Sequence, residues 1–485
     1  MSDNEGITPV PVQESTFAQI DAAVNAALQA AEQWAASGGA QRSGLLRELA
    51  SALEAGRERL VALADAESHL GAGRLSGELD RTAYQLRAFA DAVDAGEPYA
   101  VIYDPAVAGA PPAGRPRLLR VAVPLGPVAM FAASNFPFAF SVLGGDTASA
   151  LAAGCPVVVK AHPAHPGLSN AVFDLAVEAV RRCGAPPGVI GMVSGASREV
   201  GVHLVRHPDI AAVAFTGSHR GGVALQKEIN ARETPIPFFG ELGSINPIVA
   251  LPPALETQGE ALATALAASI AQGCGQFCTS PGVLIVHRNA TTDRFIRQLA
   301  EAMDAQNTHA MLTPAMRANF DEGVARLNLH PEARRLTAGE QTPDRHPVPN
   351  LVAIGTEAFL RHPELREEIF GPSCVVVTVD STQALQQVLA AIGGSLTVTV
   401  WGADNEDADT AAVVRSAIRI AGRVLFAGVP TGVAVTRAQH HGGPWPASTQ
   451  PQTTSVGLMA MHRFLRPVAL QAPPGWLAAR RGMPL

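Results

Sequence analysis

The sequence predicts an α/β protein with more than one domain. The chain has 485 residues, which exceeds the roughly 250–300 residues at which a single core stops growing. Apolar residues make up 47% of the chain and charged residues 16%, as is typical of a globular protein. Buried-strand runs alternate with amphipathic stretches over 127–218 and again from 247. That alternation predicts parallel sheets with helical crossovers.

The N-terminal part is expected to be helical. Two stretches between residues 17 and 98, "FAQIDAAVNAALQAAEQWA" and "RSGLLRELASALEAGRERLVALADAES", place apolar residues at helical spacing. The Pro/Gly-rich stretch 104–117 excludes a regular helix and predicts an exposed connection into the strand "LLRVAVPLG".

Two alternating units follow. The first has the expected strands "PVAMFAA", "PVVVKA", "GVIGMVSG" and "IAAVAFTGS", and the helix "FSVLGGDTASALAAG" should end near Gly154. The second has the expected strands "PIVAL", "PGVLIVH", "SCVVVTVD", "LTVTVWG" and "RVLFAG". Apolar strands without alternation predict sheets that are covered on both faces.

Charge and cysteine usage exclude several classes. The net charge of −7 is spread along the chain without a Lys/Arg run, so neither nucleic acid nor a membrane surface is an expected partner. The polar start "MSDNEGITPVPVQEST" differs from a signal peptide, and a cytoplasmic location is expected. The odd number of cysteines, 5, argues against a disulfide framework. Cys274 and Cys278 lack a second ligand pair, so no metal site is predicted.

Four motifs carry candidate chemistry, each with an ordinary structural alternative. Cys278 in "GQFCTSPG" is either a reactive thiol or a buried structural one. Glu241 in "FFGELGSINP" is a general base whose pKa burial would raise, or a turn residue facing water. Asn135 in "AASNFPFAFS" donates to an oxyanion or serves turn geometry. Glu368 in "EEIFGP" could accept hydrogen bonds from a ribose.

A nucleotide site would need an unusual turn here. The fingerprint G-x-G-x-x-G is absent after the first strand. The turn "FTGSHRGG" (215–222) follows an expected strand and precedes an expected helix, so its N–H groups could bind an anion. It could equally be a plain connection. Lys160 ends another strand, where ligands commonly bind in α/β sheets.

The order of these motifs resembles the NAD(P)-dependent aldehyde dehydrogenase family, from about Phe17 to Pro467. The resemblance implies that Cys278 attacks an aldehyde carbon, with Asn135 holding the oxyanion and Glu241 activating the water that hydrolyses a thioester. Phe136 would contact the substrate. It also implies that the cofactor contacts residues of the other motifs: Lys160, Gly217, Ser218, Glu368 and Phe370.

The cofactor is predicted to be NADP in preference to NAD. Many family members read K-x-x-E at the strand end, whereas this chain reads Lys160-Ala161-His162-Pro163. No acid in this string would repel a 2′-phosphate, and His162 and Arg220 could pair with it. The alternative is that Arg220 is a solvated charge and NAD is used.

Longer strings, such as "HGGPWPAST", resemble the α-ketoglutarate semialdehyde (2,5-dioxovalerate) dehydrogenase branch, with NADP-dependent fatty aldehyde dehydrogenases as the alternative. "GVAVTRAQHHGGP" (432–444) departs from that branch at Ala434, Thr436 and Arg437. Arg437 could meet a substrate carboxylate. A cysteine-dependent thioester hydrolase is the alternative from another class, because the histidines of "HPAHP" and "QHHGG" could serve as its base.

The resemblance implies three parts. A Rossmann-like cofactor-binding domain would cover 1–103 and 125–240, and an α/β catalytic domain 241–437. A small β oligomerisation arm would use 104–124 and 438–485. Alternating apolar residues in "RFLRPVALQ" suit edge pairing with another subunit, and a homodimer or homotetramer is expected.

Overall fold

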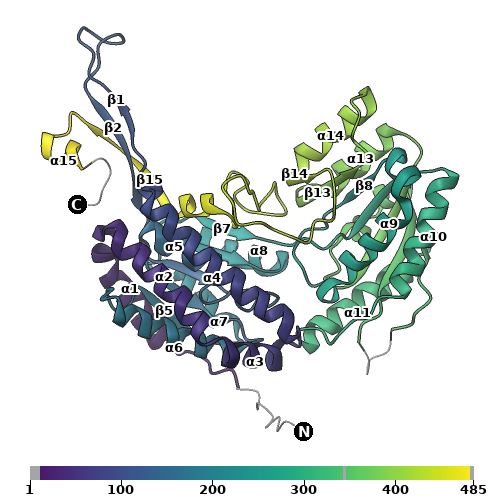
Figure 1. Ribbon diagram of the computed structural model, residues 1–485, viewed down its shortest axis with the longest axis horizontal. Helices are drawn as coiled ribbons and strands as arrows, with labels where there is room; N and C mark the ends of the chain where they lie inside the picture. The colour runs from purple at the N-terminus through teal and green to yellow at the C-terminus, as the bar shows by residue number, and fades with distance from the viewer. Residues whose placement is uncertain (1–10, 342–345, 481–485) are drawn as a thin grey trace.

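The computed structural model describes residues 11–341 and 346–480. It has two α/β lobes side by side and a thin arm that projects from the first lobe (Figure 1). Among these residues no helix combines the length and apolar character needed to cross a membrane. The first ten residues of the predicted cofactor-binding domain and the last five of the predicted arm lie outside the described residues.

The first lobe is built on a parallel five-stranded sheet in the order β5-β4-β3-β6-β7. Its buried apolar strands are covered by helices on both faces, as the sequence predicts. The strands are β3 (Val128–Phe131), β4 (Val157–Lys160), β5 (Ile190–Val193), β6 (Ala212–Thr216) and β7 (Phe238–Glu241). The helices are α1 (Phe17–Ala36), α2 (Gly39–Ala55), α3 (Arg57–Ser68), α4 (Ala72–Asp94), α5 (Gly145–Ala153), α6 (Pro166–Arg182), α7 (Arg198–Arg206) and α8 (His219–Asn230).

The second lobe holds a seven-stranded sheet in the order β10-β11-β12-β9-β8-β13-β14, parallel except for β10. Its strands are β8 (Ile248–Ala250), β9 (Val283–His287), β10 (Ala333–Arg335), β11 (Asn350–Gly355), β12 (Ser373–Val379), β13 (Ser395–Trp401) and β14 (Ala421–Leu425). Its helices are α9 (Pro252–Ala271), α10 (Ala290–Asp304), α11 (Pro314–Asn328), α12 (Thr356–Arg361), α13 (Thr382–Ile392) and α14 (Ala408–Ile420).

The arm is a three-stranded antiparallel sheet of β1 (Ile102–Asp104), β2 (Leu118–Pro124) and β15 (Leu465–Gln471). β15 pairs with β2 of the same chain along its whole length, from Leu465 opposite Pro124 to Gln471 opposite Leu118. One side of β15 is therefore occupied within the chain, and only its other side is open to a further strand. A short helix, α15 (Gly475–Ala479), follows.

The helix expected over "FSVLGGDTASALAAG" is shorter than predicted. It ends where expected, at Gly154 with φ +96°, but it begins only at Gly145 because residues 140–144 form turns. A Cβ on Gly144 would lie 2.5 Å from the carbonyl oxygen of Ala139. This tight turn is held by Glu78 of α4, whose Oε1 accepts the N–H groups at 138–139. A contact between distant segments thus overrides the local helical pattern.

Candidate active site

Four predicted site residues lie at one edge of the five-stranded sheet. Lys160 is the last residue of β4 and Glu241 the last of β7. Asn135 follows β3, and Gly217 follows β6. Because the strands are parallel, their carboxyl ends form one edge. The connections diverge between β3 and β6, where α/β sheets bind ligands.

The second lobe supplies Cys278 on the loop before β9. After α9 the chain turns sharply, with positive φ at Gly273, Cys274 and Gly275. A Cβ on Gly275 would lie 2.3 Å from the carbonyl carbon of Gly371, so glycine is required where this loop packs against "EEIFGP".

Asn246 holds the backbone at Cys278 and just after it. Its buried side-chain amide donates to the carbonyl oxygens of Cys278 (2.8 Å) and Ser280 (3.0 Å). The carboxamide oxygen accepts from Ser244 and Thr397 at 2.9 and 3.1 Å. The sequence reasoning did not single out Asn246, because its partners lie far away along the chain.

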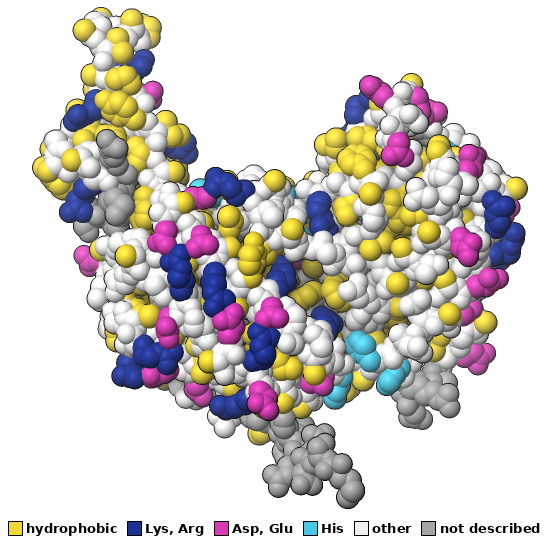
Figure 2. All heavy atoms as spheres, in the orientation of Figure 1, with side chains coloured by type: hydrophobic (Ala, Val, Ile, Leu, Met, Phe, Trp, Pro, Cys, Tyr) yellow, Lys and Arg dark blue, Asp and Glu magenta, His cyan; other side chains and the backbone are white. Residues whose placement is uncertain are grey.

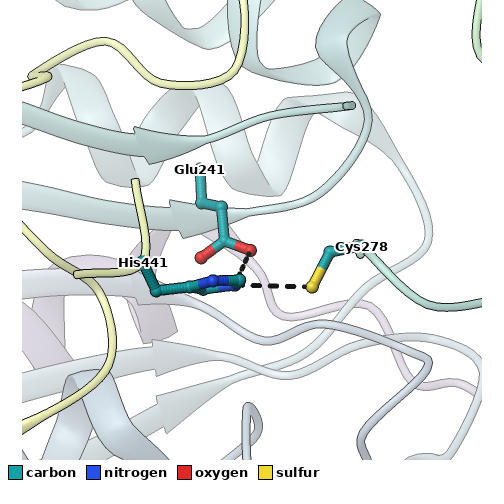
Figure 3. Close-up of side chains that lie close together, drawn as sticks. All are labelled: Glu241, Cys278 and His441. Carbon is teal, nitrogen blue, oxygen red and sulfur yellow. Dashed lines mark hydrogen bonds and ion pairs between the residues drawn. The ribbon is translucent and has the colours of Figure 1, made fainter. Parts of the chain in front are cut away.

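Cys278, Glu241 and His441 converge in one cluster, in which Glu241 and His441 are buried and Cys278 is half-buried (Figure 3). Nε2 of His441 lies 3.5 Å from Sγ of Cys278 and 3.0 Å from Oε1 of Glu241. Ser455 donates its hydroxyl to the other carboxylate oxygen of Glu241. His441 was missed as a site residue of the dehydrogenase. The only signal was its place in "QHHGG", which the sequence reasoning connected with the hydrolase alternative.

The surroundings shift the pKa values of Cys278 and Glu241 in opposite directions. Burial raises the pKa of Cys278 well above its usual value, and the neighbouring carboxylate of Glu241 raises it further. The resting thiol is therefore protonated. Burial also raises the pKa of Glu241, but His441 and the hydrogen bonds from His441, Ser455 and Cys278 outweigh burial, so the net pKa is lowered. The prediction that burial would leave Glu241 with a raised pKa was wrong, because the sequence did not reveal these partners.

The side chain of Asn135 contacts the loop that carries Cys278. Its side-chain Nδ2 donates to the carbonyl oxygen of Gln276 at 3.0 Å, two residues before Cys278. Arg74 of α4 donates to the carbonyl oxygen of Asn135 at 2.7 Å. Phe136 lies edge-on to Phe277, with ring centroids 5.1 Å apart. Asn135 and Phe136 thus lie beside the nucleophile, and their roles toward an oxyanion and a substrate stay predictions.

Most of the predicted cofactor residues lie in two places, at the start of α8 in the first lobe and around a small cavity of the second lobe. Ser218 caps α8 by accepting from Gly221 N at 3.2 Å, and Arg220 is exposed in the first turn of that helix. Glu368 and Phe370 line a small cavity, and burial raises the pKa of Glu368 to about 7. A Cβ on Gly243 would lie 2.3 Å from the Glu368 carboxylate, which explains a glycine after Glu241-Leu242.

Lys160 has an acidic neighbour that the local string does not contain. Its ammonium group donates to the carbonyl oxygen of Gly195. Burial lowers its pKa to about 8, and the nearby carboxylate of Glu14 partly opposes that shift. The expectation that no acid would repel a 2′-phosphate holds for residues 160–163. It is wrong for the folded site, because the N-terminal segment brings the carboxylate of Glu14 close to Lys160. Burial also lowers the pKa of His162 well below its usual value, so this imidazole brings no charge.

Arg437 does not join the cluster. Its guanidinium forms an ion pair with Glu97, and its side chain is 64% exposed. Within the described part of the chain, no hydrogen bond or ion pair connects Arg437 to Cys278, Glu241 or Asn135.

Comparisons with known proteins agree with this geometry. The model of the aldehyde dehydrogenase family matches residues 4–443. Alpha-ketoglutaric semialdehyde dehydrogenase 2 of Azospirillum brasilense is 42% identical over 463 residues, covering 94% of this chain and 87% of that protein. Its counterpart in Acinetobacter baylyi is 38% identical over 461 residues, with the same coverage. Lactaldehyde dehydrogenase from Escherichia coli has a similar fold, with a TM-score of 0.80 at 20% identity over 94% of this chain and 92% of that one.

Proposed function

Because the chain belongs to the aldehyde dehydrogenase family, we propose that it oxidises α-ketoglutaric semialdehyde to α-ketoglutarate with NAD(P)⁺. The reaction is supported by the convergence of Cys278, His441 and Glu241 at the carboxyl edge of the sheet. The substrate is supported by two relatives of that name, 42% and 38% identical over 94% of the chain.

The residues at the sheet edge suit a dinucleotide cofactor. The ammonium of Lys160 and the N-terminus of α8 at Ser218 offer positive charge and donors to phosphate groups. The carboxylate of Glu368 offers an acceptor to ribose hydroxyls. When bound, the nicotinamide accepts the hydride that leaves the aldehyde carbon.

Each step uses a group of the cluster. The Cys278 thiol transfers its proton to Glu241, its acidic neighbour, and the thiolate attacks the carbonyl carbon. The amide of Asn135 and the backbone N–H of Cys278 donate to the resulting oxyanion, a contribution of roughly 10²–10³ in rate. After hydride loss, Cys278 holds a thioester, and Glu241 releases the thiol proton to solvent so that it is a carboxylate again. Glu241 takes a proton from water, the water attacks the thioester carbon, and the thiolate leaves with release of the acid.

His441 positions Cys278 and Glu241 relative to each other. Its Nε2 faces both the sulfur and the carboxylate, so its N–H donates to Glu241 at rest and is within reach of a thiolate. The other ring nitrogen, Nδ1, is buried and has no hydrogen-bond partner in the described part of the chain. A hydrolase triad uses the two nitrogens of histidine for two different partners. The sharing of one nitrogen therefore favours the dehydrogenase over the thioester hydrolase.

NADP remains our proposed preference. Pro163 replaces the acid of K-x-x-E, and Arg220 is exposed beside the α8 turn. Glu14 argues against NADP, but three donors of 196–197 already bind its carboxylate, at 2.6–2.9 Å. The ratio of kcat/KM for NADP to that for NAD decides the point. A strong preference for NAD would defeat this part, and Glu14→Gln should raise the ratio.

The arm supports assembly into a homodimer or homotetramer. Hydrophobic side chains gather along it in Figure 2, including Ile102, Tyr103 and Val107, which are exposed. Exposed apolar patches of this kind mark interfaces. Light scattering after size exclusion should give a dimer or tetramer mass, and deletion of residues 105–114 should lower it. A wild-type monomer would contradict this assembly. A cytoplasmic location stays a prediction.

The function is tested by nicotinamide absorbance with a panel of aldehydes. We expect the highest kcat/KM for α-ketoglutaric semialdehyde, and no signal for Cys278→Ser. Preference for a long alkyl aldehyde would favour the fatty aldehyde dehydrogenase instead. Thioester cleavage without any nicotinamide reduction would favour the hydrolase.

A further inference from the structure

Arg81 of α4 carries a guanidinium group for which the described residues provide no hydrogen-bond acceptor. Its Nη1 is buried and has no hydrogen-bond partner. The group lies over the ring of Phe140, 5.3 Å from the centroid. Across residues 11–341 and 346–480, no hydrogen bond or ion pair to Arg81 occurs. A buried cationic donor without an acceptor costs free energy, so such a group is suited to an anionic ligand.

The charged neighbours of Arg81 on the same helix face are already engaged. Glu78 binds the backbone N–H groups at 138–139 at 2.8 and 3.0 Å, and it forms no ion pair with Arg81 in the described chain. Arg74 donates to the carbonyl oxygen of Asn135. Helical spacing puts residues 74, 78 and 81 on one face. Arg81 is therefore the arginine of this face whose guanidinium makes no hydrogen bond in the described chain, although Nη1 of Arg74 and Oε2 of Glu78 are also buried without a partner there, and the carboxylate of Glu78 attracts Arg81.

A row of aromatic rings connects Arg81 to the nucleophile. Phe140 lies edge-on to Phe136 at 5.2 Å, and Phe136 lies edge-on to Phe277 at 5.1 Å. Phe277 immediately precedes Cys278. Burial raises the pKa of Cys278, and the positive charge of Arg81 acts in the opposite direction, so the field of the guanidinium reaches the sulfur.

Two other arginines are poorer candidates for a substrate anion. Arg423 of β14 also interacts electrostatically with Cys278, but its Nη1 and Nη2 donate to the carbonyl oxygens of Gly432 and Pro430. Arg437 is exposed and paired with Glu97.

We propose that Arg81 binds the carboxylate of an acidic aldehyde whose carbonyl carbon is held at Cys278, and that it thereby selects anionic aldehydes over alkyl ones. This inference rests on the proposed function, because α-ketoglutaric semialdehyde carries a carboxylate at the end opposite its aldehyde. The rings of Phe140, Phe136 and Phe277 lie between the two ends and would flank the carbon chain. The guanidinium offers the paired N–H groups that recognise a carboxylate.

The test compares Arg81→Met and Arg81→Lys with Arg87→Met, a control on the same helix whose arginine is paired with Glu54 at 2.6 Å. Each is assayed with α-ketoglutaric semialdehyde and with pentanal, which has the same carbon number but no carboxylate. Arg81→Met should lower kcat/KM for the acidic aldehyde by roughly 10- to 100-fold, chiefly through KM, as expected for one charge-assisted hydrogen bond. For pentanal, which has no carboxylate, kcat/KM should fall much less, because only the weak effect of the Arg81 charge on the sulfur is lost. Arg81→Lys should keep part of the preference, and Arg87→Met all of it.

The outcomes separate the two proposals. If the wild type does not prefer α-ketoglutaric semialdehyde to pentanal, the proposed function fails at that point. If the wild type has the preference and folded Arg81→Met keeps it, or loses activity equally on both aldehydes, the assignment of Arg81 alone is overturned. Thermal melting identifies a variant that fails to fold. In that case the KM values of Arg81→Lys for the two aldehydes decide. An unchanged KM for the acidic aldehyde together with a changed KM for pentanal contradicts carboxylate binding.

Discussion

Nε2 of His441 lies 3.5 Å from the sulfur of Cys278, although the two residues are 163 positions apart in the sequence. The same nitrogen contacts Glu241, so one imidazole connects the nucleophile with the base. Replacing His441 with Phe, which keeps the ring volume, should lower kcat by roughly 10- to 10²-fold, as expected for losing a hydrogen bond to a charged group. His440→Phe is the adjacent control. An unchanged kcat in His441→Phe would remove this residue from the mechanism.

Glu241→Gln should separate the two halves of the reaction. The variant keeps the shape of the side chain but cannot take a proton from water. Because Glu241 also accepts the thiol proton of Cys278, we expect a slowed burst of NADPH, of one equivalent per site at most, and then a steady-state rate roughly 10²–10⁴ below wild type. Stopped-flow absorbance measures both phases, and exposed Glu233→Gln is the control. If the variant loses the burst but keeps the steady-state rate of the wild type, Glu241 acts only in a step before hydride transfer.

The apo-enzyme thiol should react slowly at neutral pH. Burial and the Glu241 carboxylate raise the pKa of Cys278, so the thiolate fraction grows as the pH rises toward that raised value. The rate of iodoacetamide alkylation should therefore still be increasing above the pKa of an ordinary thiol. Glu241→Gln should shift the profile to lower pH, because it removes a negative charge. A plateau near neutral pH in the wild type would contradict this reading.

NADP binding should weaken as the pH rises through about 8, the pKa to which burial lowers Lys160. Below this pH the ammonium is charged and attracts phosphate, and above it the attraction is lost. The dissociation constant for NADP, measured by fluorescence, should rise over that interval. Lys160→Arg should abolish the pH dependence, because arginine stays charged. An identical profile for this variant would assign the titration to another group.

The buried ion pair between Arg463 and Asp146, 2.6 Å apart, should stabilise the attachment of the C-terminal segment to the first lobe. Asp146→Ala leaves a buried guanidinium unpaired and should lower the free energy of unfolding by about 3–5 kcal/mol. The double variant with Arg463→Met should lose less than the sum of the two single variants. Denaturant unfolding measures all three, and strictly additive losses would show that the pair is not coupled.

Much of the candidate site could be predicted because its residues lie in short sequence motifs. Cys278, Glu241 and Asn135 lie in short strings whose glycines and neighbours indicate a special backbone, and parallel strands bring their ends to one edge. The strand β7 was not predicted as a strand, although its apolar residues 238–240 precede Glu241. Its four residues are too short for periodicity to distinguish a strand from a turn.

The sequence by itself determined the alternation of strands and helices and the family, and it singled out Cys278, Glu241 and Asn135 as the proposed nucleophile, base and oxyanion donor, because periodicity and short motifs depend on neighbouring residues. The tertiary structure alone decided which distant groups meet. It brought His441 into contact with both Cys278 and Glu241, placed Glu14 beside Lys160, and left Nη1 of Arg81 without a hydrogen bond among the described residues. The physical reason is that burial and electrostatic interactions depend on distance in space, which one linear sequence does not encode for residues hundreds of positions apart.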